Sequence, residues 1–327
     1  WRESFRKLGL EKTDFDSFDP NFYSTIKCTV ESYSNSFSPI DNIIPLLDNP
    51  ITLNEVEVVV KNLKRGKAVG VDGIFNEVFK YGGSQATKSL WKLYDYIFQN
   101  EDFPTDWSRG IIFPLFKGGP NEYRYDPNKY RGITLLSIVG KTYTAILNNR
   151  ISNYLENNGI LVDEQAGFRK NRSTTDQLFI LTEIILNRRP KPTYAAFIDI
   201  TKAYDRVWRD GLWYKLYKAG IKGKLWRILR KIYKHVESCV LLGKNRTDWF
   251  ETEVGLRQGC LLSPILFLIF LNDLVEEINK LGKGVKCGSK RVSILLFADD
   301  IVLIADSKED LELLLQVVVL NGDLNLI

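Results

Sequence analysis

Two apolar segments that each run into acidic residues constrain the fold of this chain most. The first is Tyr194–Ile198, followed by Asp199, and the second is Ile294–Ala298, followed by Asp299 and Asp300. A short, continuous apolar run is typical of a strand buried on both faces. A carboxylate at the end of such a strand is costly unless it reaches solvent or a ligand. The three aspartates are therefore candidate site residues.

A further apolar segment, Ile301–Ala305, follows the adjacent aspartates and predicts a β-hairpin with Asp299 and Asp300 at its tip. Adjacent carboxylates repel each other, and a divalent cation neutralises them. If the strand that ends at Asp199 pairs beside this hairpin, three carboxylates converge on one sheet edge. Because His235 is the single histidine, such a site favours Mg²⁺ over zinc, and two ions there suit phosphoryl transfer. A plain Asp-Asp turn is the alternative.

Composition indicates a globular protein with a polyanionic partner. The 327 residues are 44% hydrophobic and 26% charged, which is ordinary for two or three compact units. The first 60 residues hold five basic and ten acidic side chains, and the rest hold 40 basic and 30 acidic ones. Basic clusters bind polyanions by releasing counterions, although a solvated helix face explains any one cluster equally well. The most regular cluster comprises Arg227, Arg230, Lys231 and Lys234.

The sequence predicts neither a membrane span nor a disulfide scaffold. The longest uncharged apolar run, Cys260–Asn272, is shorter than the ~18 to 20 residues that a membrane helix needs. The four cysteines are too few and too widely spaced for a disulfide framework or a Cys-x-x-Cys site. We therefore expect a soluble, intracellular protein. The chain starts at Trp1 and contains no Met, so we expect it to be part of a longer protein.

Periodicity and capping signals predict a mixture of helices and strands. Thr52 and Glu55 form a capping box at the start of an apolar helical stripe. Apolar runs punctuated by Gly and Pro predict a pair of strands. The expected elements are helices at 53–64, 139–157 and 174–186, strands at about 110–116 and 130–136, and a linker or irregular arm over 1–50.

Six ordered blocks of the sequence resemble the reverse transcriptases of non-LTR (LINE-type) retrotransposons. The central blocks are F-I-D-I-T-K-A-Y-D, G-L-R-Q-G-C-L-L-S-P-I-L-F and L-L-F-A-D-D-I-V-L-I. The upstream blocks are K-A-V-G-V-D-G-I-F-N-E-V-F-K, Y-R-G-I-T-L-L-S-I-V-G-K and E-Q-A-G-F-R-K-N-R-S-T. The resemblance covers residues 51–327. Group II intron reverse transcriptases are the nearest alternative, but they usually show Y-A-D-D and P-Q-G where this chain has F-A-D-D and R-Q-G.

The resemblance implies an α+β right-hand polymerase fold with fingers and palm. The palm would carry an antiparallel sheet with the carboxylate hairpin and packed helices. Fingers would occupy 51–190, the palm 191–206 and 258–327, and a fingers or palm insertion 207–257. A thumb and an upstream endonuclease would lie in missing segments of the same polyprotein, so we expect these 327 residues alone to extend primers poorly or not at all.

The implied activity is RNA-directed DNA polymerisation, by nucleotidyl transfer from a dNTP to a primer 3′-OH on an RNA template. Two Mg²⁺ ions, or Mn²⁺ as a substitute, would be the cofactors. The partners would be the RNA template, the DNA primer or target and dNTPs, in a retroelement ribonucleoprotein of the nucleus and cytoplasm. Matching positions imply the following roles: metal ligands Asp199, Asp299, Asp300 and the carbonyl of Ile200; nucleotide contacts Lys117, Arg131, Tyr204, Gln258 and Gly259; template contacts Arg169 and Lys170.

The resemblance implies that Tyr204 selects deoxyribonucleotides over ribonucleotides. It matches the aromatic residue that closes the pocket under the sugar, where the ring would clash with a 2′-hydroxyl; a packing aromatic is the alternative. An RNA-templated RNA polymerase would need a small residue at this position. A catalytically silent, domesticated RNA-binding scaffold is a further alternative, but it would have no physical reason to keep three repelling carboxylates together.

Overall fold

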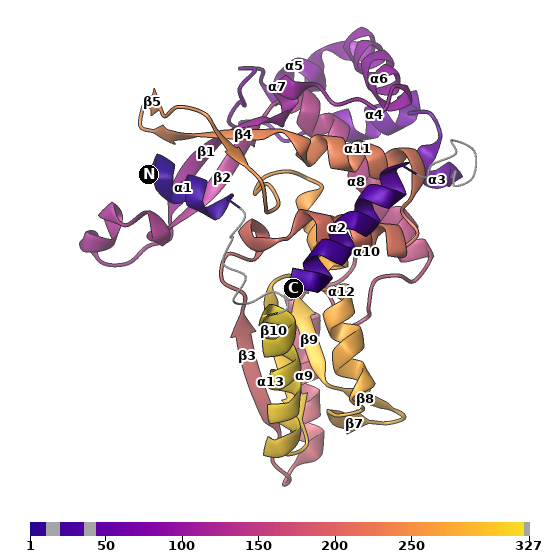
Figure 1. Ribbon diagram of the computed structural model, residues 1–327, viewed down its shortest axis with the longest axis vertical. Helices are drawn as coiled ribbons and strands as arrows, with labels where there is room; N and C mark the ends of the chain where they lie inside the picture. The colour runs from indigo at the N-terminus through magenta and orange to yellow at the C-terminus, as the bar shows by residue number, and fades with distance from the viewer. Residues whose placement is uncertain (11–19, 36–43, 324–327) are drawn as a thin grey trace.

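The computed structural model describes residues 1–10, 20–35 and 44–323, which form a mixed α+β fold with several sheets (Figure 1). This confirms the α+β class expected from the sequence. The elements in chain order are α1 (Arg2–Leu8), α2 (Pro20–Asn35), α3 (Pro45–Asp48), α4 (Leu53–Lys61), α5 (Asn76–Tyr81), α6 (Gly83–Gln99), α7 (Thr105–Ser108), β1 (Arg109–Phe116), η2 (Asn121–Tyr125), η3 (Pro127–Lys129), β2 (Tyr130–Leu136), α8 (Ile138–Asn157), α9 (Thr174–Arg188), β3 (Tyr194–Asp199), η4 (Ala203–Arg206), α10 (Arg209–Lys218), α11 (Gly223–Lys234), β4 (Val236–Leu242), β5 (Asn245–Arg246), β6 (Phe250–Thr252), α12 (Ser263–Lys280), β7 (Val285–Cys287), β8 (Lys290–Val292), β9 (Ile294–Phe297), β10 (Asp300–Ala305) and α13 (Lys308–Asp323).

Strands β3, β10 and β9 form an antiparallel sheet in that order. Strands β9 and β10 are the predicted hairpin, with Ala298 and Asp299 in the turn and Asp300 as the first residue of β10. In Figure 1 this sheet lies in the lower part of the molecule beside α9, α12 and α13. The arrowhead of β3 points toward the middle of the molecule, so the acidic end of the sheet lies there.

Strand β3 is not buried on both faces, and that expectation is wrong. It is an edge strand, and Phe197 on its outer face is 73% exposed. Ala196 and Ile198 on the opposite face pack against the main core. A continuous apolar run does not distinguish an edge strand from a central one, because the difference depends on which partners arrive from elsewhere in the chain. One face of the sheet is therefore accessible along β3.

A second sheet joins segments that are far apart in the sequence. Strands β1 and β2 pair antiparallel, as predicted, from Gly110 opposite Leu136 to Phe116 opposite Tyr130. Strand β1 also pairs parallel with β4, and β4 pairs with β5 and β6. Helix α1 packs on this sheet through Phe5. The segment that begins at 236 therefore belongs to the same sheet as the strands at 109–136.

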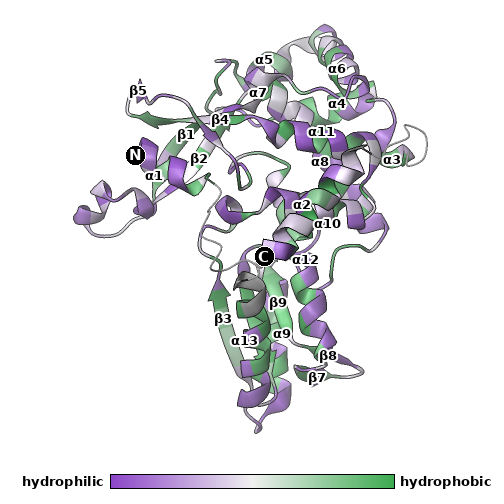
Figure 2. Ribbon diagram, viewed as in Figure 1, coloured by the Kyte–Doolittle hydropathy of each residue, from purple (hydrophilic) through white to green (hydrophobic). Residues whose placement is uncertain are grey.

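The main core is built around helices. Helix α12 is apolar and buried from Ile265 to Leu271, and α11 buries its apolar face while its basic residues face outward. Figure 2 shows hydrophobic strands in the lower sheet and helices with mixed faces around them. The predicted helices at 53–64, 139–157 and 174–186 correspond to α4, α8 and α9, and the capping box of Thr52 and Glu55 is present.

The expected irregular arm over 1–50 is helical where the structure describes it, in α1, α2 and α3. In α2, Ile26 and Val30 are buried, and Tyr33 stacks on Tyr217 with ring centroids 3.7 Å apart. These apolar residues recur every three or four positions, which is the helical repeat that the polar Ser, Asn and Thr residues between them obscure. The rest of the expected arm, 11–19 and 36–43, lies outside the described residues.

Within the described ranges, no helix has both the length and the apolar character that crossing a membrane requires.

A buried arginine fixes α8 to the start of α4. The guanidinium of Arg150 donates to both carboxylate oxygens of Glu55 at 2.6 and 2.9 Å, and to the backbone carbonyls of Leu47, Asn49 and Pro50. Burial would raise the pKa of Glu55, but the hydrogen bonds and charge of Arg150 outweigh it and lower that pKa below its ordinary value. Three segments of the chain thus depend on one side chain.

We predict that Arg150→Met destabilises the fold by about 3 to 5 kcal/mol, because it leaves a partly buried carboxylate and three carbonyls without their donor. The matched control is Arg6→Met, which removes an exposed pair with Glu3 and should cost less than about 1 kcal/mol. Urea denaturation measures both. Since the folded-state pKa of Glu55 is lowered, the difference should be full above about pH 4.3 and shrink as the pH falls further. Equal midpoints for the two variants would contradict the prediction.

Candidate active site

The register of the three-stranded sheet brings together the acidic residues that the sequence singled out. Asp300 pairs directly with Asp199, and Val302 with Phe197, so all four side chains lie on the same face, on which Asp199, Asp300 and Phe197 are exposed. Asp299 precedes them in the hairpin turn. Desolvation, followed by the negative charges of Asp299 and Asp199, raises the pKa of Asp300 above its ordinary value. The geometry thus places three carboxylates at one end of the sheet.

The donor chemistry of this edge fits a hard divalent cation. In the part of the chain that the structure describes, no group of three or more His, Cys, Asp or Glu side chains is already arranged as a set of metal ligands. Carboxylate oxygens are nevertheless the ligands that Mg²⁺ and Mn²⁺ prefer. The effect of Asp299 and Asp199 on the pKa of Asp300 shows that their charges interact, and a cation would relieve that repulsion. The backbone of Ile200 follows directly after Asp199.

Tyr204 lies between the carboxylates and the core. It belongs to the short helix η4, and its half-buried ring stacks on Phe267 of α12 with centroids 5.0 Å apart and planes 15° from parallel. Burial first, and then the charge of Asp299, raises the pKa of Tyr204 well above its ordinary value. The phenol is therefore neutral and close enough to Asp299 to sense its charge. The ring also packs against the core, as the alternative interpretation expected.

A carboxylate to which sequence analysis gave no role connects two of the predicted nucleotide contacts. The side-chain amide of Gln258 donates to both oxygens of Asp205 at 3.2 and 3.3 Å. Burial raises the pKa of Asp205, against the opposing effects of that hydrogen bond and of the charges of Lys202 and Lys117. Gln258 thus contacts Asp205, and the charge of Lys117 acts on the same carboxylate. Asp205 ends the F-I-D-I-T-K-A-Y-D block, but no local pattern shows that Gln258 is its partner.

The loop that carries Gln258 and Gly259 lies directly against β2. The backbone N–H of Thr134 donates to the carbonyl of Gln258 at 2.7 Å. Gly259 has φ +114°, and a Cβ atom there would lie 2.6 Å from the carbonyl oxygen of Thr134. Glycine is needed at this position for both reasons. The loop therefore touches the second sheet at Thr134 of β2.

Lys117 and Arg131 lie near the far end of the β1–β2 hairpin. Arg131 is opposite Leu115, and the backbone N–H of Lys117 donates to the carbonyl of Lys129 at 3.0 Å. Because side chains alternate along a strand, Lys117 follows the direction of Leu115 and shares a face with Arg131. Both cations are exposed.

Arg169 is engaged inside the fold, whereas Lys170 is exposed. The guanidinium of Arg169 donates to both carboxylate oxygens of Glu156 at 2.8 and 2.7 Å, and to the carbonyls of Val162 and Gln165. Its side chain is only 6% exposed. Of the two predicted template contacts, the structure leaves Lys170 accessible and uses Arg169 to hold a loop to α8.

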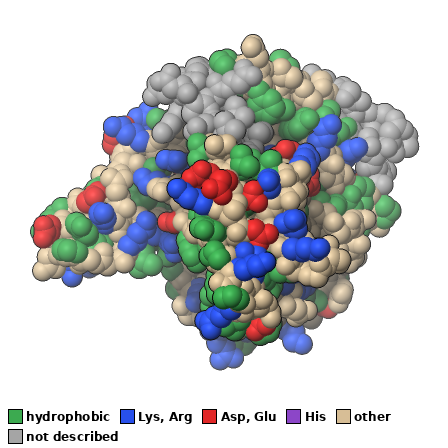
Figure 3. Space-filling model, turned by 90° about the horizontal axis from the view of Figure 1, so that it is seen from below, with side chains coloured by type: hydrophobic (Ala, Val, Ile, Leu, Met, Phe, Trp, Pro, Cys, Tyr) green, Lys and Arg blue, Asp and Glu red, His purple; other side chains and the backbone are tan. Residues whose placement is uncertain are grey.

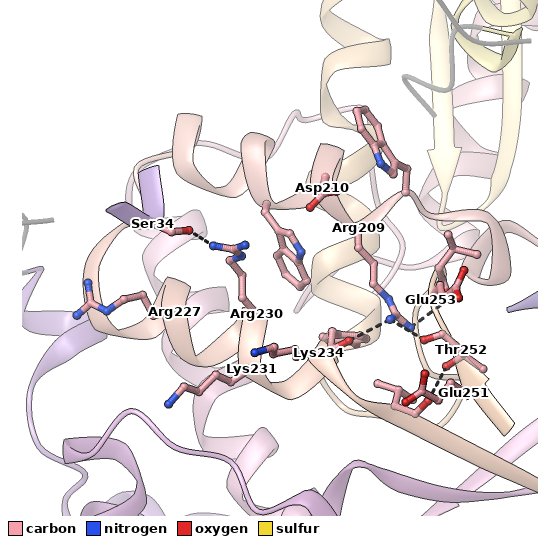
Figure 4. Close-up of a pocket in the computed structure, with 15 residues that line it drawn as sticks. Ser34, Arg209, Asp210, Arg227, Arg230, Lys231, Lys234, Glu251, Thr252 and Glu253 are labelled. Carbon is pink, nitrogen blue, oxygen red and sulfur yellow. Dashed lines mark hydrogen bonds between the residues drawn. The ribbon is translucent and has the colours of Figure 1, made fainter. Parts of the chain in front are cut away.

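The basic cluster on α11 lines a cleft of about 520 Å³ (Figure 4). Part of its charge is balanced within the fold, because Arg227 pairs with Glu101 at 2.5 Å and Lys231 lies 3.9 Å from Asp102. Arg230 donates to Ser34. Viewed from below, the surface also mixes basic, acidic and apolar side chains (Figure 3). Fewer residues of this cluster are therefore available to a polyanion than the sequence suggested. Lys231 and Lys234 are its exposed members.

Gln165 was also missed by sequence analysis. It lies in the E-Q-A-G-F-R block, from which only Arg169 and Lys170 were selected. The structure buries it against the carboxylate hairpin. A polar residue followed by Ala-Gly carries no local sign of burial, so nothing in the sequence separates it from an ordinary loop residue.

Comparison with known proteins matches this sequence to a family. The profile of the family described as "Reverse transcriptase (RNA-dependent DNA polymerase)" matches residues 117–321. This range includes each of the predicted site residues.

Relatives of known description come from transposable elements. The chain is 29% identical over 286 residues to "Probable RNA-directed DNA polymerase from transposon BS" of Drosophila melanogaster, covering 85% of this chain and 30% of that protein. It is 30% identical over 263 residues to "RNA-directed DNA polymerase from mobile element jockey" of Drosophila funebris, covering 79% and 28%. It is 26% identical over 265 residues to "Retrovirus-related Pol polyprotein from type-1 retrotransposable element R2" of Nasonia vitripennis, covering 80% and 24%. The chain thus spans less than a third of each relative.

We predict that Gly259→Ala destabilises the fold and disturbs the loop that presents Gln258. The added Cβ would meet a backbone oxygen, so the cost should exceed that of an unfavourable φ alone by about 1 to 3 kcal/mol. Gly243→Ala is the matched control, because Gly243 has φ +62° but open space where the added methyl group would lie. Thermal unfolding of both variants compares them. The prediction fails if the two alanines lower the midpoint equally.

Proposed function

The chain belongs to the reverse transcriptase (RNA-dependent DNA polymerase) family, and on that premise we propose that it transfers nucleotides from dNTPs to the 3′-OH of a primer on an RNA template. The relatives support a protein of a non-LTR retrotransposon as its source. The RNA template, the DNA primer or target and the dNTPs would be its partners.

The observation that carries this proposal is the pairing of Asp300 with Asp199 beside Asp299. A turn that used adjacent aspartates only for its geometry would need no third carboxylate opposite them. The raised pKa of Asp300 is a cost that a non-catalytic scaffold would have no reason to maintain. The carboxylates therefore favour an enzyme over a silent RNA-binding scaffold.

We propose Asp199, Asp299 and Asp300, with the carbonyl of Ile200, as the residues that would hold two Mg²⁺ ions, with Mn²⁺ as a substitute. When bound, such ions lower the pKa of an attacking hydroxyl and stabilise the charge that develops on the transferred phosphate. The protein's own part is to keep the carboxylates on one sheet edge.

The surrounding residues suit an incoming nucleotide. Lys117 and Arg131 lie on one face of the β1–β2 hairpin and could pair with the phosphates. Gly259 would let the backbone approach the nucleotide closely, while the side chain of Gln258 is held by Asp205.

We propose that the sheet of β3, β10 and β9 with α12 and α13 is the palm, and that the sheet of β1, β2 and β4 belongs to the fingers. The pairing of β1 with β4, and of β4 with β5 and β6, supports assigning 236–252 to the fingers. The packing of α9 against β9 supports moving 164–188 from the fingers to the palm, so the boundary proposed at 190 shifts toward 164.

We predict that, in a longer form of the protein that includes the predicted thumb, Asp299→Asn lowers Mg²⁺-dependent dNTP incorporation on an RNA template at least about 100-fold, because a lost ligand removes several kcal/mol of charge stabilisation. Asp106→Asn, at an 86% exposed side chain, is the matched control and should be neutral. Template binding, followed by gel shift, should survive in both. Equal incorporation by wild type and Asp299→Asn would sink the catalytic assignment.

We predict that Tyr204→Val admits ribonucleotides, because it removes the ring expected to clash with a 2′-hydroxyl. Tyr204→Phe keeps the ring and its stacking on Phe267, so it should keep the preference for deoxynucleotides. The measurement is the ratio of kcat/KM for dNTP and rNTP. An unchanged ratio in Tyr204→Val would leave Tyr204 as a packing residue only.

A further inference from the structure

The turn that carries Asp299 has an unfavourable backbone conformation. Ala298, the residue before Asp299, has φ +59°. An L-residue with a side chain rarely adopts positive φ, because its Cβ then crowds the backbone. Such a conformation persists only where the surroundings hold it in place. The question is which contacts hold it here.

One buried side chain binds both backbone groups of Ala298. The side-chain oxygen Oε1 of Gln165 accepts from the N–H of Ala298 at 2.9 Å, and its Nε2 donates to the carbonyl of Ala298 at 3.1 Å. The same Oε1 accepts from the N–H of Gly167 at 2.8 Å. Gln165 is 3% exposed. The amide is therefore engaged at both ends, with two of its three contacts on the residue next to Asp299.

The backbone around Gln165 holds it against the hairpin. Leu296 donates to the carbonyl of Glu164 at 3.0 Å, and Ala166 donates to the carbonyl of Leu296 at 2.9 Å. A Cβ atom on Gly167 would lie 2.1 Å from the backbone nitrogen of Ala298. Only glycine fits there. Residues 164–167 thus form a strap, fixed to β9, that lies against the turn.

We propose that Gln165 is a positioning residue: it fixes the Ala298 turn so that Asp299 stays in place beside the Asp199–Asp300 pair, and it thereby sets the affinity of the carboxylates for a divalent cation. The consequence for catalysis rests on the proposed function, whereas the consequence for the turn does not. Gln165 itself touches neither cation nor nucleotide in this scheme.

The chain offers a matched comparison in Gln177. Its Nε2 donates to the carbonyls of Glu164 at 2.9 Å and Leu296 at 3.0 Å. It therefore binds the same strap and the same strand with the same chemical group, but its contacts stop before the turn. A role limited to folding would make the effect of each substitution at the turn follow its effect on overall stability. A positioning role would make the two glutamines different.

The experiment compares Gln165→Leu with Gln177→Leu in the 327-residue chain. The first readout is hydrogen exchange of the segment that includes Ala298, and the second is Mn²⁺ binding measured by electron paramagnetic resonance. We expect Gln165→Leu to speed exchange at the turn about 10-fold or more and to weaken Mn²⁺ binding about 10-fold, the lower end of what loss of a supporting contact costs a metal site. Gln177→Leu should leave the exchange rate of the turn and the affinity for Mn²⁺ unchanged, even if it lowers the unfolding midpoint as much as Gln165→Leu does.

The outcomes separate this proposal from the proposed function. If a longer form of the protein that includes the predicted thumb incorporates no dNTP, the proposed function fails, while exchange and Mn²⁺ binding still decide the role of Gln165. If the 327-residue wild type binds no Mn²⁺, exchange alone decides it. Equal effects of the two leucine variants at the turn would overturn the proposal. Should Gln165→Leu fail to fold, Gln165→Met provides the same comparison, because its unbranched side chain fills the space without replacing the amide.

Discussion

The register between β3 and β10 is the constraint on which the site depends. Ile301 and Leu303 pack into the main core, and Val302 and Ile304 on the opposite face pack in a smaller cluster with Ile184 of α9. A slip of one residue would exchange these two sets of side chains and move Asp300 away from the face that it shares with Asp199. The hydrophobic core therefore enforces the meeting of Asp300 with Asp199. The carboxylates repel each other, yet burial of the apolar residues in the same strands holds them together.

The second constraint is the route of the chain between the two sheets. Residues 255–259 lie between β6 and α12. The N–H groups of Gly255 and Leu256 donate to the carbonyls of Val207 and Tyr204, and the carbonyl of Gln258 accepts from Thr134 of β2. One short loop thus contacts the segment after β3, the upper sheet and the start of α12. These contacts use backbone groups, and the close approach at Thr134 also requires glycine at position 259. With the loop fixed in this way, the side chain of Gln258 binds Asp205.

Prediction from sequence succeeded where the signal was local. The capping box at Thr52, the apolar runs of the two hairpins and the spacing of α8 each depend on neighbours within a few residues, and each appears in the structure. It failed where a distant partner decides the outcome. Within the described residues, β3 is an edge strand because it pairs with β10 on one side only. Arg169 is held inside the fold because it meets Glu156 of α8. The family resemblance supplied the roles of the acidic residues, but the register that joins them is a property of the fold.

Where the structure describes the chain, several acidic residues elsewhere are paired with arginines, and the three aspartates of the sheet edge are not. Glu55, Glu101 and Asp306 each form an ion pair with an arginine. Among the residues that the structure describes, no lysine or arginine forms an ion pair with the three aspartates of the sheet edge. A fold that pairs its acidic groups so readily could relieve the repulsion there with one well-placed cation. Leaving the carboxylates without such a partner costs stability, and that cost is consistent with a site kept open for an exchangeable metal ion.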